Sequence, residues 1–234
     1  RKLPRICRRR RQRTVSAKHS RADQLDLRCY LVTGTPHEKV VDVAAAAAAG
    51  GAGVVQVRSK PISVRDLTAL AIEVAAAVER ANPATKVLID DRVDVAAALM
   101  PKHNIHGVHI GQDDLDPRLA REVLGDDAII GLTTGTLPLV YQANEYADVI
   151  DYIGAGPFRP TPTKNSGREP LGLQGYPALV EASRVPVVAI GDVRAEDAAD
   201  LAATGVAGVA IVRGFMNSPD PHATARQVLA GFAS

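Results

Sequence analysis

Three polar side chains alternate with smaller or apolar ones in the segment Gln56-Val57-Arg58-Ser59-Lys60. At the two-residue period of a strand, Gln56, Arg58 and Lys60 share one face. Arginine offers a phosphate a planar pair of donors, and lysine offers it a compact positive charge. A strand that simply ran out into solvent would not require this alternation to persist through three positions, so the segment predicts an anion-binding site.

Two acidic pairs follow later apolar runs of the chain. Asp90-Asp91 ends one run directly, and Asp113-Asp114 follows another within a few residues. Mg²⁺ takes oxygen ligands, keeps several waters and typically uses one or two carboxylates together with substrate phosphates. Aspartate before a helix also serves as an N-cap, a role for which Asp116 is a further candidate. The residues alone leave both alternatives open for the two pairs.

A loop of prolines and hydroxyl groups follows the short apolar run at residues 152–155. Its prolines fix φ and so stiffen the backbone that carries Thr161, Thr163 and Lys164. Donors held on a stiff backbone lose less entropy when they converge on a phosphate. The loop is therefore a candidate anion site, with a solvated connector as the alternative because proline and threonine are ordinary loop residues.

These residues follow short apolar runs that recur along the chain with helical segments between them. Eight such runs lie at residues 28–33, 54–57, 86–89, 107–110, 129–132, 151–155, 187–190 and 208–212. Residues 40–49 and 64–81 are the clearest helices. Eight strands that alternate with helices predict a single (β/α)₈ TIM barrel with its active site on the loops after the strands. An open doubly wound sheet is the alternative, although no glycine-rich nucleotide-binding turn follows the first run.

Weaker signals stand at three other strand ends of such a barrel. Thr133 and Thr134 either donate to a phosphate or cap a helix. Gly191 follows the seventh run, and Val212-Arg213 closes the eighth. Loops after strands seven and eight of barrels often hold a phosphate against backbone amides, which makes this end of the predicted barrel a candidate phosphate site.

The composition fits one large α/β domain. With 234 residues, 46% hydrophobic content and only 3% aromatic residues, the chain is expected to build its core from Ala, Val, Leu and Ile. No apolar stretch approaches the length of a membrane span. His106 and His109 are expected to be structural, because no third His or Cys lies at metal-binding spacing. Cys7 and Cys29 form no metal or disulfide framework, which favours a reducing cytoplasm.

Charge is segregated along the chain. Residues 1–21 contain ten Lys or Arg and no acidic residue, whereas the rest of the chain contains 18 basic and 26 acidic residues. An acidic body with a basic arm is not typical of a nucleic-acid-binding fold, and the arm lacks aromatic residues that would stack on bases. We expect residues 1–27 to be a disordered or extended basic arm, or part of an upstream segment, and residues 28–234 to form the barrel.

Taken together, these segments resemble the thiamine-phosphate synthase family from about Cys29 to Ala225. The matching pieces are Tyr30-Leu31-Val32-Thr33, residues 56–60, Asp90-Asp91-Arg92-Val93-Asp94, residues 107–115, Gly156-Pro157 with Thr161-Pro162-Thr163-Lys164, and Val188-Ala189-Ile190-Gly191. Each piece is weak by itself, but six pieces in the right order at the right strand ends are specific.

The resemblance implies a Mg²⁺-dependent transferase of thiamine biosynthesis that couples hydroxymethylpyrimidine diphosphate with a thiazole phosphate, plain or carboxylated, and releases pyrophosphate. It implies that the pyrimidine diphosphate is held by Gln56, Arg58, Lys60, Asp90, Thr133 and Lys164, of which Arg58, Lys60, Thr133 and Lys164 act in catalysis. It implies Asp91 and Asp114 as Mg²⁺ ligands, and Thr161, Thr163, Gly191, Val212 and Arg213 as the lining of the thiazole phosphate site. The expected partners are small-molecule substrates, without membrane or nucleic acid, and the resemblance leaves a homo-oligomer open.

Three positions depart from the family's pattern. Position 90 is Asp where the family often has Asn, and position 192 is Asp where it usually has a second Gly. Position 213 is Arg where many members have Ser. We expect Arg213 to offset the charge of Asp192 and to contribute positive charge to the thiazole phosphate site.

Three alternative functions compete with the synthase. A thiazole tautomerase relative shares the barrel but has no use for a magnesium carboxylate pair, so Lys60, Asp91 and Asp114 favour the synthase. A non-catalytic phosphate-binding barrel whose arm contacts RNA is a second alternative. The third is that the chain is one module of a longer thiamine-pathway fusion.

Overall fold

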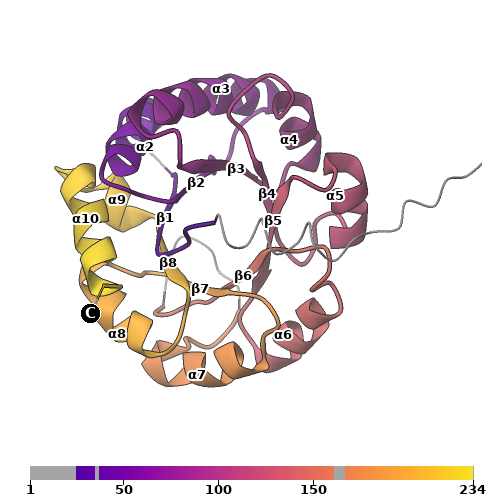
Figure 1. Ribbon diagram of the computed structural model, residues 1–234, viewed down its shortest axis with the longest axis vertical. Helices are drawn as coiled ribbons and strands as arrows, with labels where there is room; N and C mark the ends of the chain where they lie inside the picture. Colours follow the sequence, from indigo (N-terminus) through magenta and orange to yellow (C-terminus); the bar gives the residue numbers. More distant parts are fainter. Residues whose placement is uncertain (1–24, 35–36, 161–166, 234) are drawn as a thin grey trace, which may run out of the picture.

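Eight parallel strands close into a barrel in the computed structural model, which describes residues 25–34, 37–160 and 167–233 (Figure 1). The strands are β1 Cys29–Val32, β2 Val54–Val57, β3 Lys86–Asp90, β4 Gly107–Ile110, β5 Ile129–Thr134, β6 Tyr152–Ala155, β7 Val187–Ile190 and β8 Gly208–Ile211. Neighbours in sequence pair with one another, and β1 also pairs with β8, so the described sheet has no edge. The predicted (β/α)₈ barrel is confirmed, and the open sheet is wrong. Residues 1–21 of the basic arm lie outside the described residues.

Helices form an outer ring around the strands (Figure 1). They are the short turns η1 His37–Lys39 and η2 Ala195–Asp197, with α2 Val40–Ala49, α3 Val64–Ala81, α4 Val93–Leu99, α5 Pro117–Leu124, α6 Leu137–Asn144, α7 Gly172–Ala182, α8 Ala198–Ala203, α9 Arg213–Met216 and α10 Pro221–Gly231. Side-chain caps start several of them: Ser63, Asp116, Thr136 and Asp220 each accept a backbone N–H of the first turn. No helix in the described part of the chain is long and apolar enough to cross a membrane.

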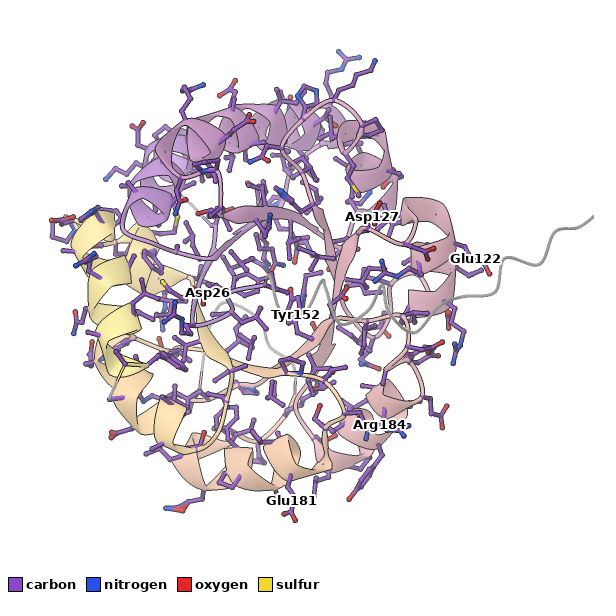
Figure 2. All side chains as sticks on the ribbon, viewed as in Figure 1. Asp26, Glu122, Asp127, Tyr152, Glu181 and Arg184 are labelled. Carbon is purple, nitrogen blue, oxygen red and sulfur yellow. The ribbon has the colours of Figure 1, made fainter. Side chains whose placement is uncertain are left out.

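Apolar side chains pack in two layers that the strands separate. The outer layer, between strands and helices, contains many buried alanines, among them Ala44 and Ala47 of α2 and Ala71 of α3. Small side chains let these helices lie close to the sheet, which fits the composition. The inner layer fills the barrel and includes Tyr30, Val54, Leu88, Ile129, Tyr152 and Val188. Figure 2 shows Tyr152 inside the ring of strands.

The segment before β1 packs against the amino-terminal ends of the strands. Leu27 is buried in the inner layer. Its carbonyl oxygen lies so close to Gly208 that a Cβ there would be 1.6 Å away. Asp26 accepts two hydrogen bonds of 2.9 and 2.7 Å from the Arg28 guanidinium and one of 3.1 Å from the Arg28 backbone N–H, and these hydrogen bonds lower the pKa of Asp26. The predicted site residues lie at the opposite, carboxyl ends of the strands.

Candidate active site

The predicted polar face of residues 56–60 is confirmed in part: Gln56 and Arg58 line one cavity, whereas β2 ends at Val57 and Lys60 lines a second cavity beside it. Gln56 has 4% of its surface exposed, and Arg58 follows at the next inward position and lines a cavity. The Gln56 side chain donates from Nε2 to Oδ1 of Asp90 at 2.5 Å and accepts at Oε1 from the hydroxyl of Tyr30 at 2.8 Å. Both ends of a buried amide are therefore satisfied, which fixes its orientation.

Asp90, at the end of β3, is a buried carboxylate beside two cations. Its Oδ2 lies 3.7 Å from Nε of Arg58 and 3.1 Å from Nζ of Lys60. Burial and the neighbouring charge of Asp91 raise the pKa of Asp90, against the two cations that lower it. Burial alone would lower the pKa of Lys60, but the Asp91 and Asp90 carboxylates raise it above its ordinary value. Lys60 therefore keeps its positive charge, as an anion site requires.

Asp91 and Asp114 come together from the loops after β3 and β4. Lys60 forms an ion pair with Asp91, and Oδ2 of Asp114 accepts the backbone N–H of Gly111 at 2.6 Å. Burial raises the pKa of Asp114, as do the charge of Asp91 and a hydrogen bond with it, while the bond from Gly111 lowers it. Two carboxylates that disfavour each other's charge would gain from a cation between them.

The N-capping alternative does not account for either acidic pair. Arg92 is the N-cap of α4, and no side chain makes a capping bond there. Asp116, not the preceding pair, caps α5 by accepting the backbone N–H of Arg118 at 2.8 Å. Within the described residues, no group of three or more Asp, Glu, His or Cys side chains is placed to hold a metal ion. A cation at Asp91 and Asp114 would complete its shell with water and substrate oxygens, the usual pattern for Mg²⁺.

Three residues that sequence reasoning did not single out as functional join the site through hydrogen bonds. His109 of β4 contacts Oγ1 of Thr133 through Nε2 and the hydroxyl of Tyr152 through Nδ1, both at 2.9 Å. The Tyr152 hydroxyl lies 2.7 Å from that of Tyr30. His109, expected to be structural, thus lines the cavity. Strand alternation could have placed each of these side chains on the inward face of its own strand, but it could not have shown that they contact one another.

One cavity at the carboxyl ends of the strands brings most predicted site residues together. It is lined by Gln56, Arg58, Asp90, Thr133, Gly191, Val212 and Arg213. A second cavity, lined by Lys60, Asp91 and Asp114, shares Asp90 with the first. Three further predicted residues, Thr161, Thr163 and Lys164, lie outside the described residues. Among the described residues, the two cavities meet at the carboxylate of Asp90.

The loops after β7 and β8 contribute backbone and one ion pair. Gly191 has a φ of 102°, and a Cβ there would lie 2.5 Å from Cα of Pro157. Such a close approach excludes other residue types at position 191, which also lines the cavity. Arg213 forms an ion pair with Asp192, so the expected pairing of these two residues is confirmed. The contact of Arg213 with a phosphate stays a prediction.

Arg168 is a cation of the cavity that sequence reasoning missed. Its Nη1 donates to the carbonyl oxygen of Thr134 at 2.7 Å, which ties the loop before α7 to the end of β5. The side chain lines the same cavity as Arg58 and Arg213. An arginine in a loop of Gly, Pro and Glu gives no periodic signal, so only its position in space indicates a role.

A family model described as thiamine monophosphate synthase matches residues 29–215. The chain belongs to this family. It is 87% identical over 209 residues to a thiamine-phosphate synthase of Corynebacterium jeikeium, a match that covers 89% of this chain and 96% of the relative. It is 62% identical to a thiamine-phosphate synthase of Corynebacterium efficiens, covering 88% and 95% of the two chains.

A solved structure of thiamine phosphate pyrophosphorylase from Pyrococcus furiosus is similar over the whole barrel. Its TM-score is 0.78 at 27% identity, with 90% of this chain and 97% of that chain covered. Orotidine 5′-phosphate decarboxylase from Pyrococcus horikoshii, with a TM-score of 0.62 and 10% identity, shares the fold alone. The predicted family and the assignment to an enzyme class are thereby confirmed.

Proposed function

We propose that this enzyme couples 4-amino-2-methyl-5-hydroxymethylpyrimidine diphosphate with 4-methyl-5-(2-phosphoethyl)thiazole to give thiamine phosphate and pyrophosphate, or with the carboxylated thiazole to give the same products and carbon dioxide. The observation that carries the proposal is one cavity in which Gln56, Arg58 and Asp90 share a lining with Gly191 and Arg213. An anion site next to a second phosphate site suits two phosphorylated substrates. The name shared by the relatives at 87% and 62% identity supports the same reaction.

The β2 and β3 side of the cavity holds the pyrimidine diphosphate in this proposal. Arg58 and Lys60 neutralise the diphosphate oxygens, while Gln56 and Asp90 bind the ring with their amide and carboxylate. Thr133 binds the same substrate from β5. Lys164 is assigned a further cationic role by the family resemblance alone.

Asp91 and Asp114 would hold Mg²⁺, because they are neighbouring carboxylates with a diphosphate expected beside them. When bound, the ion supplies Lewis-acid stabilisation of the charge that develops on the leaving diphosphate. The ion pair of Lys60 with Asp91 keeps a protein cation at the same place. Lys60 is therefore placed to neutralise the diphosphate oxygens both before and after the bond to the pyrimidine breaks.

The chemistry needs no protein nucleophile. The bond from the pyrimidine methylene carbon to the diphosphate oxygen breaks with both electrons on oxygen, and the aminopyrimidine ring stabilises the resulting cation. The lone pair of the thiazole nitrogen then forms the new carbon–nitrogen bond. The protein's part is to neutralise the leaving group, align the two substrates and keep water from the cation.

The β6 to β8 side of the cavity holds the thiazole phosphate. Gly191 and Val212 bring backbone close to the phosphate, and Arg213 adds positive charge. Thr161 and Thr163 are assigned to this substrate by the resemblance. The two substrates would thus lie on opposite sides of the cavity with their reacting atoms between them.

Pyrophosphate release tests the proposal. The full chain is given the pyrimidine diphosphate with and without thiazole phosphate, first with Mg²⁺ and then with EDTA. Release that needs both substrates and the metal is the expected result. Release without thiazole phosphate at an equal rate would indicate a hydrolase, and no release under any condition would overturn the proposal.

Two variants of one acidic pair locate the metal. Asp114→Asn should reduce release by about 100-fold, because a metal ligand that also faces Asp91 is lost. Asp113→Asn is the matched control: it removes the neighbouring exposed carboxylate, and Asp113 lines neither cavity. Equal losses in the two variants would count against a metal at Asp91 and Asp114.

A further inference from the structure

A chain of hydrogen bonds crosses the barrel interior from Gln56 to Thr133, and we call it the interior chain. It passes through the hydroxyls of Tyr30 and Tyr152 and the imidazole of His109, on strands β2, β1, β6, β4 and β5 in turn. Successive polar atoms are 2.8, 2.7, 2.9 and 2.9 Å apart. Every step is a normal hydrogen-bond length, so the five side chains form one connected network.

The interior chain occupies space inside the barrel that a side chain at position 131 would otherwise fill. Tyr30 and Tyr152 have 1% and 0% of their surface exposed and lie among the apolar residues of the inner layer. A Cβ on Gly131 would lie 2.3 Å from the Tyr152 hydroxyl oxygen and 2.5 Å from Nδ1 of His109, so only glycine fits there. Barrel interiors are usually filled by branched apolar residues. A polar network that displaces such packing is expected to have a function.

The direction of each hydrogen bond in the interior chain follows from the contact of its first member, Gln56, with Asp90. Its carboxylate accepts from Nε2 of Gln56, which turns Oε1 toward Tyr30 and makes that hydroxyl the donor. Burial raises the pKa of the Tyr30 hydroxyl, so it keeps its proton. Because Tyr30 donates to Gln56, the 2.7 Å contact with Tyr152 requires Tyr152 to donate to the oxygen of Tyr30.

The same logic carries through the imidazole. Burial raises the pKa of the Tyr152 hydroxyl as well, so Tyr152 keeps its proton. This single proton already makes the hydrogen bond to the oxygen of Tyr30. The Tyr152 oxygen must then accept from Nδ1–H of His109. In a neutral imidazole this leaves Nε2 as an acceptor, and the hydroxyl of Thr133 donates to it. Thr133, which lines the cavity, is left with oxygen lone pairs for a ligand.

This inference rests on the proposed function. We propose that His109, held in place by Tyr152 and Tyr30, is a positioning residue. It makes Thr133 a hydrogen-bond acceptor for the exocyclic amino group of the pyrimidine. The oxygens of a Mg²⁺-bound diphosphate are ionised hydrogen-bond acceptors, so a second acceptor would disfavour them at this point. An aromatic amino group has two N–H donors. Thr133 thus recognises the ring of the substrate and not its diphosphate.

The residue at position 90 determines this polarity. A carboxylate can only accept from Gln56, whereas an asparagine there could also donate to it and allow the interior chain to run in the opposite direction. In the reversed direction Thr133 would receive a proton from His109 and donate its own into the cavity. The carboxylate of Asp90 therefore fixes Thr133 as an acceptor in this chain.

Binding of two probes to the full chain tests the inference without requiring turnover. The probes are 4-amino-5-hydroxymethyl-2-methylpyrimidine, which has the amino group but no phosphate, and inorganic pyrophosphate in Mg²⁺, each measured by calorimetry. Thr133→Val should weaken binding of the pyrimidine by about tenfold and change that of pyrophosphate less than twofold. Thr133→Ser keeps the hydroxyl and should restore the affinity.

Variants of the tyrosines test the positioning role of His109. Tyr152→Phe removes the acceptor of Nδ1–H and should weaken pyrimidine binding about threefold to fivefold, with pyrophosphate binding unchanged. Tyr30→Phe is a second variant that interrupts the interior chain one step earlier and should act in the same direction. Tyr176→Phe is the matched control, because the buried hydroxyl of Tyr176 donates to the carbonyl oxygen of Ala155 and is not part of the interior chain. Thermal unfolding verifies that each variant folds.

The outcomes separate this inference from the proposed function. Loss of pyrophosphate binding with unchanged pyrimidine binding in Thr133→Val would show Thr133 to be a diphosphate donor and would overturn the inference alone. Unchanged pyrimidine binding in folded Tyr152→Phe and Tyr30→Phe would overturn the positioning role. A wild-type chain that binds neither probe would overturn the proposed function and the inference together.

Discussion

The two sides of the cavity differ in what they present to a ligand. The β2 to β4 side presents charged side chains: Lys60 lies 3.1 Å from Asp90 and pairs with Asp91. On the β6 to β8 side, Gly191 packs against Pro157, and much of the lining is glycine, proline and other apolar residues. Its cations are Arg168, which donates to the carbonyl oxygen of Thr134, and Arg213, which pairs with Asp192. The first side therefore presents a cluster of charges around Asp90, and the second presents mainly backbone and apolar residues, with its two arginines held by protein groups.

The difference matches the demands of the two proposed substrates. A leaving diphosphate gains negative charge as its bond breaks, and preorganised cations stabilise that charge most in the transition state. The thiazole phosphate keeps its charge through the reaction, so backbone amides that bind it equally in both states are sufficient. We therefore expect variants of the charged side to lower kcat and variants of the backbone side to raise KM.

The largest effect is expected at Lys60. Lys60→Met removes the cation shared by Asp90 and Asp91 and should lower kcat by about 100-fold or more, with little change in the KM of thiazole phosphate. Lys102→Met, in the exposed turn after α4, is the matched control and should retain activity. Steady-state kinetics with each substrate varied in turn measures both. An equal rise in both KM values with unchanged kcat would contradict the distinction between the two sides.

A smaller effect is expected where the backbone approaches most closely. Gly191→Ala forces a φ of 102° on alanine and a contact 2.5 Å from Cα of Pro157, so it should lower the free energy of unfolding by about 1–3 kcal/mol. It should also raise the KM of thiazole phosphate by about tenfold. Chemical denaturation and kinetics provide the two measurements.

Gly125→Ala is a control for the strain alone. Gly125 has a φ of 85°, and a Cβ there would have no atom within 4 Å. Its loss of stability reports the cost of positive φ, and the excess in Gly191→Ala reports the collision with Pro157. If the two variants lost the same stability and both kept a normal KM, Gly191 would have no special place in the phosphate site.

The smallest effect is expected at the ion pair. Arg213→Ala should raise the KM of thiazole phosphate about fivefold and that of the pyrimidine diphosphate less than twofold. Because 46% of the Arg213 side chain is exposed, the loss of stability should stay below about 1 kcal/mol. Arg194→Ala removes a surface arginine of the neighbouring loop, 3.8 Å from Glu196, and should change neither constant. Equal effects of Arg213→Ala on both substrates would remove Arg213 from the thiazole side.

Much of the fold could be predicted because its signals are local. The helices expected at residues 40–49 and 64–81 begin and end where α2 and α3 do. Strand bounds differ by only one or two residues, with β3 and β5 extended to include Asp90 and to reach Thr134. Period and composition depend on near neighbours in sequence, so they survive folding unchanged.

The site could be predicted only in part. Alternation along β2 placed Gln56 and Arg58 correctly, since the parity of one strand needs no knowledge of its partners. The role of His109 could not be found in this way, because its contact with Tyr152 joins residues 43 positions apart and that of Tyr152 with Tyr30 spans 122. Spacing along the chain contains no information about such pairs.

The sequence by itself determined the alternation of strands and helices, the inward face of each strand and the types of charged residue at the strand ends. The closed order of the strands, the meeting of two cavities at Asp90 and the polarity of the interior chain were decided only in the tertiary structure. The physical reason is that periodicity arises from the local geometry of the backbone. Hydrogen-bond direction depends instead on which donors and acceptors meet after the barrel has closed.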